Sequence, residues 1–258
     1  MGRPCWICGA PDSTKEHVWP AWLQKITSSA ELNYRIGVSQ DPTSWRQWTS
    51  GAFEHTSRVL CDSCNRLLGE LEGRVAPVIT AMVGAEPMRL DSVGQTLLAQ
   101  WFYKTGLMVA TTTRHQACDL PKDHYARLSE TLELPPSSEA WIAQIEQPRF
   151  SAALWLQRFD WQDRLLTEAP RAHGYIFALS VATVAGVVAV LDSSQSPQSA
   201  SMPAFELLGR APGRLLRIWP TSKHYGVAWP PSLRLTSADF QELADSFPKI
   251  GQRATPVD

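Results

Sequence analysis

The chain of 258 residues has no excess of charge of either sign. Lys and Arg number 24, Asp and Glu number 25, and the formal net charge is −1 at pH 7. The general basic surplus that often accompanies nucleic-acid binding is therefore absent, and any contact with phosphate has to come from a local set of residues. We find no internal repeat or coiled-coil pattern. Because 44% of the residues are hydrophobic, we expect a globular protein with a substantial core.

The start of the sequence lacks the charged segment, apolar run and cleavage site of a secretory signal. One stretch, residues 174–191, approaches the length of a membrane span, at roughly 18 uncharged residues. Its many valines, with Ser180 and Thr183 in its interior, instead predict two buried β-strands joined by a turn. We therefore expect a cytoplasmic protein with no membrane association.

Five cysteines without a secretory signal argue against a disulfide framework. Four of them form two Cys-x-x-Cys pairs, Cys5 with Cys8 and Cys61 with Cys64, and Cys118 stands alone. Two such pairs can offer four thiolates to a structural zinc ion. About 52 residues separate the pairs, more than in a compact zinc ribbon, so the chain between them must leave and return to a common base. The alternatives are ordinary buried thiols or a redox pair. A redox pair would need a thioredoxin-like setting, which the surroundings of Cys5 lack.

Three further residues suggest chemistry near the cysteines. Glu16 and His17 are adjacent and precede Pro20, while Asn65 follows the last cysteine of the second pair. A carboxylate and an amide oxygen are ligands for a hard cation such as Mg²⁺ or Mn²⁺, and a histidine can accept a proton from water. This set favours metal-assisted hydrolysis of a phosphodiester, with Glu16 and Asn65 on the ion and His17 as the base.

These residues resemble the HNH, or ββα-metal, endonuclease family, in the subgroup built on two zinc knuckles. The resemblance is carried by Cys5-Trp6-Ile7-Cys8-Gly9, by Glu16-His17-Val18-x-Pro20, and by Leu60-Cys61-x-x-Cys64-Asn65 with Gly69 and Leu71-Glu72. A longer, weaker similarity to uncharacterised bacterial HNH-like proteins includes Trp219-Pro220 and Trp229-Pro230-Pro231. The resemblance implies that Glu16 and Asn65 bind the catalytic metal and that His17 is the general base.

Two features depart from the family pattern. Glu16 stands where many members have Asp, which lengthens the ligand arm by one methylene group. The central Asn that orients the histidine is not assigned, because Asn33 and His55 are both candidates and their spacing does not choose between them. Glu72, about two turns after Asn65, can face the site as a substrate contact or be an exposed helix carboxylate. Trp19, Trp22, Trp45 and Trp48 can stack on bases or pack around the zinc.

We expect an α+β fold in two parts. Residues 1–75 would form the zinc-bound HNH module, with an inserted loop at about 28–57. Residues 76–258 would form a helical segment and a C-terminal, mostly antiparallel β/α region. Predicted helices span about 63–74, where Asp62 caps the start and Pro77 follows the end, and then 92–111, 121–132 and a last one that begins near Ser237. Predicted strands include 141–145, 153–156, the hairpin at 174–191 and 214–219.

The leading functional hypothesis is a metal-dependent endonuclease that acts on nucleic acid, DNA rather than RNA, in phage defence or a mobile element. The C-terminal region would select the substrate, bind a partner protein or form a homodimer. The alternative is a catalytically inactive, zinc-stabilised nucleic-acid-binding or adaptor protein that keeps the HNH shape.

Overall fold

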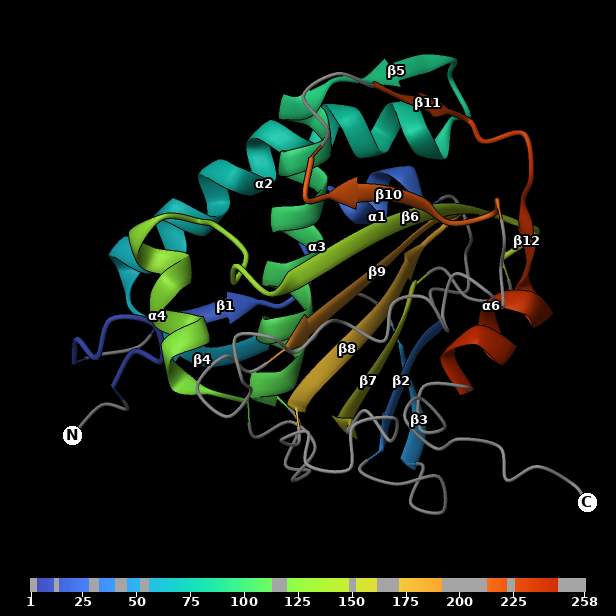
Figure 1. Ribbon diagram of the computed structural model, residues 1–258. Coiled ribbons are helices and arrows are strands. Elements are labelled where there is room, and N and C mark those ends of the chain that lie inside the picture. The colour runs from blue at the N-terminus through green and yellow to red at the C-terminus, as the bar shows by residue number, and fades with distance from the viewer. Residues whose placement is uncertain are drawn as a thin grey trace, which may run out of the picture.

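The computed structural model of the chain describes residues 4–11, 14–27, 33–39, 46–51, 56–112, 120–148, 152–161, 172–191, 213–221 and 226–245. Within them it has a mixed helical and sheet structure, which confirms the α+β prediction (Figure 1). The helices are α1 (Leu23–Ile26), α2 (Asp62–Val83), α3 (Ser92–Thr112), α4 (Lys122–Glu130) and α6 (Ser237–Asp245). The strands are β1 (Thr14–His17), β2 (Asn33–Ser39), β3 (Arg46–Gly51), β4 (Thr56–Leu60), β5 (Met88–Leu90), β6 (Ser138–Glu146), β7 (Ala152–Trp161), β8 (Ala172–Val181), β9 (Val184–Leu191), β10 (Leu216–Trp219), β11 (Val227–Trp229) and β12 (Leu235–Thr236).

An eight-stranded sheet forms the centre of the fold. Seven of its strands follow the order β10-β6-β9-β8-β7-β2-β3, and β12 pairs with β6 off this path. The pairing is antiparallel except between β2 and β7 and between β12 and β6. The stretch 174–191 is the β8–β9 hairpin, as predicted, and it turns at Ala182 and Thr183. No helix in the described parts of the chain is long and apolar enough to span a membrane.

Residues on the central strands alternate between two buried clusters. On β6, Ala140 and Ile142 belong to the cluster that contains α2 and α3, whereas Trp141 and Ala143 belong to the one that contains α6. This alternation follows from the two-residue period of a strand. Helices on opposite faces therefore cover the sheet, α3 on one side and α6 on the other (Figure 1).

Two glycines let α3 lie close against the sheet. A Cβ atom added to Gly186 on β9 would lie 2.5 Å from the ring of Phe102 on α3. The relation is reciprocal, because a Cβ atom on Gly106 of α3 would lie 2.5 Å from the ring of Phe177 on β8. Each ring thus occupies the space of a missing side chain, and any larger residue must push α3 outward.

Helix α2 is longer than expected. We predicted that it would end near Arg74, before Pro77, but it continues through Pro77 to Val83. A proline removes one backbone donor and usually ends or kinks a helix. Here Pro77 lies on the exposed side, while Val75, Ile79 and Met82 stay buried on the other and keep the helix packed. The prediction of Asp62 as the N-cap is also off by one residue, since Cys61 is the N-cap.

Other helix boundaries agree better with the sequence. Asp91 caps α3, because its Oδ1 atom accepts a hydrogen bond of 2.8 Å from the Gly94 N–H. A reciprocal capping box opens α6, where the Thr236 N–H donates to the Asp239 carboxylate at 2.8 Å and the Asp239 N–H donates to Thr236 Oγ1 at 3.0 Å.

The segment expected to be a loop, residues 28–57, contains the strands β2 and β3. They pair with each other, and β2 joins β7 in parallel, so this segment extends the C-terminal sheet. A local pattern of residues does not reveal such a partner more than 100 positions away along the chain, as between Ile36 and Leu154. The division near residue 75 stays a prediction, and α2 runs across that point without a break.

We predict that Gly186→Ala lowers the free energy of unfolding by about 1–3 kcal/mol, as is typical for overpacking of a well-packed core. Equilibrium denaturation in urea measures this change. Gly73→Ala is the matched control, because a Cβ atom at exposed Gly73 meets nothing within 4 Å. Alanine there should raise helix stability by roughly 0.5–1 kcal/mol. Equal effects of the two substitutions would contradict the close approach of α3.

Candidate metal centre and the adjoining hollow

The first cysteine pair lies on a tight N-terminal turn. The Cys5 N–H donates to the Ala10 carbonyl at 2.7 Å, and the Gly9 N–H donates to the Cys5 carbonyl at 2.9 Å. Gly9 has a φ of 73°, a backbone region that glycine adopts without strain. The Trp6 N–H also donates to the Val59 carbonyl at 2.8 Å, which ties the turn to β4. This turn therefore presents Cys5 and Cys8 toward the end of β4.

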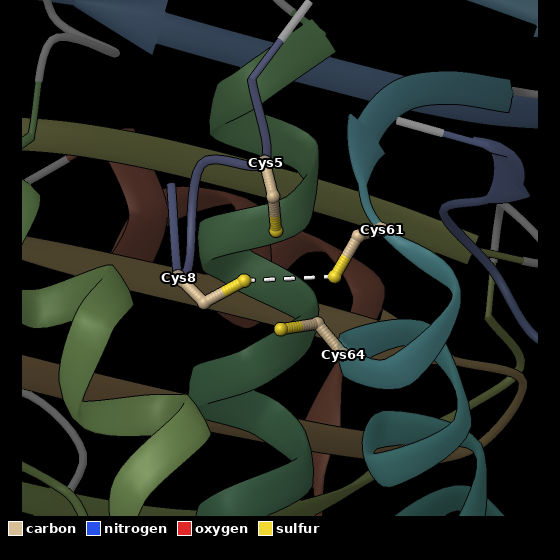
Figure 2. Close-up of side chains that lie close together, drawn as sticks. All are labelled: Cys5, Cys8, Cys61 and Cys64. Carbon is tan, nitrogen blue, oxygen red and sulfur yellow. Dashed lines mark hydrogen bonds between the residues drawn. The ribbon is translucent and has the colours of Figure 1, made fainter. Parts of the chain in front are cut away.

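The second cysteine pair lies where β4 passes into α2. Cys61 has extended backbone geometry as the N-cap residue, and Cys64 is in the first turn of the helix. Figure 2 shows both side chains pointing toward those of Cys5 and Cys8. The Sγ atoms of Cys8 and Cys61 are 3.5 Å apart, although the two residues are 53 positions apart in the sequence.

The four sulfur atoms lie close enough together to bind one metal ion. All of them lie within 4.8 Å of one another, and the Cys5, Cys61 and Cys64 side chains are buried. A zinc ion with Zn–S bonds of about 2.3 Å would need sulfur atoms roughly 3.8 Å apart. The cluster thus meets the ligand number, type and spacing of a closed structural zinc site, which supports the predicted metal-binding role of these cysteines.

The thiols of the cluster differ in their acidity. A hydrogen bond of 3.1 Å between Ser63 Oγ and Cys61 Sγ, and then the Cys64 N–H, lower the pKa of Cys61 to about 6. Burial, followed by the Cys8 and Cys61 sulfurs, raises the pKa of Cys64 well above its usual value. Cys61 is therefore more readily ionised at neutral pH than Cys64, and a bound cation would favour the thiolate form of its ligands.

A two-stranded sheet joins this centre to the residues predicted to carry chemistry. Strands β1 and β4 pair antiparallel, with His17 opposite Thr56, and the Thr14 hydroxyl donates to the Leu60 carbonyl at 3.2 Å. Asn65 lies in the first turn of α2, which follows β4 directly. It lines the same hollow as His17, although the strand register places His17 opposite Thr56, at the other end of β4. The local order is thus β1, β4 and α2, a ββα arrangement around the cysteine cluster (Figure 1).

His17 and Asn65 line one hollow, which we call the α2 hollow. Its cavity volume is about 10 Å³, roughly the space of one water molecule, within about 260 Å³ of non-atom space that includes open solvent. Its polar and charged lining comes from His17, Asn65, Glu72 and Lys104, and its apolar lining from Val18, Leu60, Leu68 and Met108. Gly69 completes the lining, and a Cβ atom there would meet nothing within 4 Å. The surface of α2 is therefore open between Asn65 and Glu72.

Glu72 and Lys104 form an ion pair at the hollow, between α2 and α3. The Lys104 side chain is 3% exposed and the Glu72 side chain 17% exposed. Sequence reasoning weighed Glu72 but missed Lys104. One signal was present, because Lys104 is the only charged residue in the sequence of α3. A single ammonium group on an otherwise uncharged, buried helix needs a partner or a function.

The other residues predicted from the sequence to act at the site either do not line the α2 hollow or have side chains outside the described residues. The Glu16 backbone pairs with Ser57, but its side chain lies outside the described residues. His55 lies outside them as well, and Asn33 begins β2 in the large sheet. Trp19 is fully buried, and the Trp22 ring lies 6.2 Å from that of Trp101, so both belong to the packing of the core. The side chains of Trp45 and Trp48 are not described.

Comparison with known proteins gives no match for this chain among family models, curated protein sequences or solved structures.

We predict that the purified protein carries about one zinc ion per chain, bound by the four cysteines. Cys64→Ser should lose the metal and unfold at a lower temperature, whereas Cys118→Ser, which belongs to neither Cys-x-x-Cys pair, should retain the metal and the unfolding temperature. Metal analysis and thermal unfolding measure these effects. Zinc binding should also weaken as the pH falls, because protons compete for the thiolates. A Cys64→Ser protein with its full zinc content would contradict the site.

Proposed function

We propose that the protein is a metal-dependent endonuclease that hydrolyses phosphodiester bonds of nucleic acid, with DNA as the preferred substrate. The observation that carries the proposal is the placement of His17 and Asn65 on one open hollow beside a four-cysteine cluster. The ββα order of β1, β4 and α2 supports an HNH module, as does the resemblance of the cysteine and Glu-His motifs.

His17 is proposed as the general base. It lies at the end of β1, is exposed to solvent and lines the α2 hollow. Its imidazole would take a proton from the attacking water, whose oxygen forms a bond to phosphorus. The bond from phosphorus to the leaving oxygen breaks, and that oxygen takes up a proton. An exposed base with access to an open hollow suits a large substrate, because a polymer can approach only a surface site.

Asn65 and Glu16 are proposed as ligands of a catalytic Mg²⁺ or Mn²⁺. The donor set is consistent with this role for Asn65, whose half-buried side chain offers an oxygen at the hollow. When bound, such an ion would stabilise the negative charge that develops on the phosphate. The four cysteines would have no part in the chemistry and would fix the distance between His17 and Asn65.

We expect the zinc-loaded protein to cleave plasmid DNA when Mg²⁺ or Mn²⁺ is added. His17→Ala should reduce the cleavage rate by about 10²–10⁴-fold, the usual contribution of a general base. The side chain is exposed, so the variant should unfold at nearly the same temperature as the parent protein. Cleavage by His17→Ala at the parent rate would refute the assignment of this residue.

A second test concerns Asn65. Asn65→Ala should raise the Mg²⁺ or Mn²⁺ concentration needed for half-maximal cleavage, whereas Asn65→Asp, which retains an oxygen ligand, should not. Glu70→Ala is the matched control, because Glu70 is exposed on the same helix and does not line the hollow. DNA binding without cleavage in the presence of several divalent ions would favour the alternative, an inactive binding or adaptor protein.

A further inference from the structure

Lys104 is a buried cation with one described partner. Its side chain is 3% exposed, and among the described residues its ammonium group donates a hydrogen bond to Glu72 alone. An ammonium group has three donors. Burial of a charged group is costly unless its donors are satisfied, so a lysine in this position needs more than one acceptor.

The lysine lies at the edge of the α2 hollow. Of the described residues that line it, Lys104 is the only Lys or Arg, and it shares the hollow with His17 and Asn65. Gly69 leaves the adjoining surface of α2 without a side chain, so a ligand can enter from that side. The hollow thus combines an opening, a proton acceptor and an ammonium group with one acceptor among the described residues.

We propose that Lys104 binds a non-bridging oxygen of the substrate phosphate, with Glu72 holding the ammonium group in place. A phosphate is the fitting ligand because it offers several acceptor oxygens and a negative charge to a point-like cation. The inference rests on the proposed function for the identity of the substrate, and it makes Lys104 the residue that selects a phosphodiester. It also gives this chain of near-neutral net charge a local means of binding phosphate.

Glu72 has a defined effect in this arrangement. Its side chain is 17% exposed and lines the same hollow, so its carboxylate would compete with an incoming anion for the ammonium group. If the ion pair were purely structural, loss of either partner would lower the stability of the protein and leave phosphate binding unchanged. A phosphate site predicts that loss of the two partners changes phosphate binding in opposite directions.

The test uses the full-length, zinc-loaded protein without Mg²⁺ or Mn²⁺ and titrates it with inorganic phosphate in a calorimeter. The parent protein should bind with a Kd on the order of 1 mM. Glu72→Gln removes the competing negative charge and should tighten binding by about threefold or more. Lys122→Met is the matched control, because Lys122 is exposed on α4 and does not line the hollow, and it should leave the Kd unchanged.

Lys104→Met alone leaves the partly buried Glu72 carboxylate unpaired and can destabilise the protein. The decisive variant is therefore Lys104→Met with Glu72→Gln, which removes both charges together. If it folds, as thermal unfolding would show, it should bind phosphate at least about tenfold more weakly than Glu72→Gln alone. Equal phosphate affinity of these two proteins, or no binding by the parent, would overturn the proposal. If the parent binds phosphate through Lys104 but never cleaves nucleic acid, the proposed function fails and the phosphate site stands.

Discussion

The cluster of four cysteine sulfur atoms brings together the N-terminal turn and the start of α2. Cys8 and Cys61 are 53 positions apart in sequence and 3.5 Å apart in space. Closing a long segment reduces the entropy of the chain, although the cost grows slowly with length. Four thiolates packed within 4.8 Å would repel one another without a cation. A bound zinc ion would remove this repulsion and join the N-terminal turn to α2. The pairing of β1 with β4 connects His17 to the same strand-to-helix junction.

The segment between the cysteine pairs is anchored at a second place. Its strands β2 and β3 extend the large sheet through the parallel pairing of β2 with β7. The cysteine turn, α2, α3 and the central strands also share one hydrophobic cluster that includes Cys5, Leu68 and Val188. Movement of α2 would therefore disturb both the cysteine centre and the packing on the sheet. The α2 hollow lies between elements that are each fixed by contacts elsewhere.

The parts of the fold that the sequence predicts are those with local patterns. The valine-rich sequence between Gly174 and Leu191 predicted the β8–β9 hairpin. The spacing of the two Cys-x-x-Cys pairs predicted the four-sulfur cluster. The helix through Pro77 was missed, since its continuation depends on the packing of Ile79 and Met82. The strands β2 and β3 and the role of Lys104 depend on partners distant in sequence. A local pattern holds no information on such partners.

Lys104 and Glu72 raise the question of why α3 carries a charge at all. Replacing a buried ion pair with apolar side chains is often neutral or stabilising, and the neighbours of Lys104 on α3 are a buried Tyr103 and Thr105. Stability alone therefore does not explain the ion pair. Anion binding explains it better, because the pair lies beside the open surface at Gly69 and buried, low-dielectric surroundings strengthen the attraction between an ammonium group and an anion. Gly106, which brings α3 close to the sheet, lies two residues after Lys104 on the same helix. The packing of the core and the charge at the hollow are thus determined by the same helix.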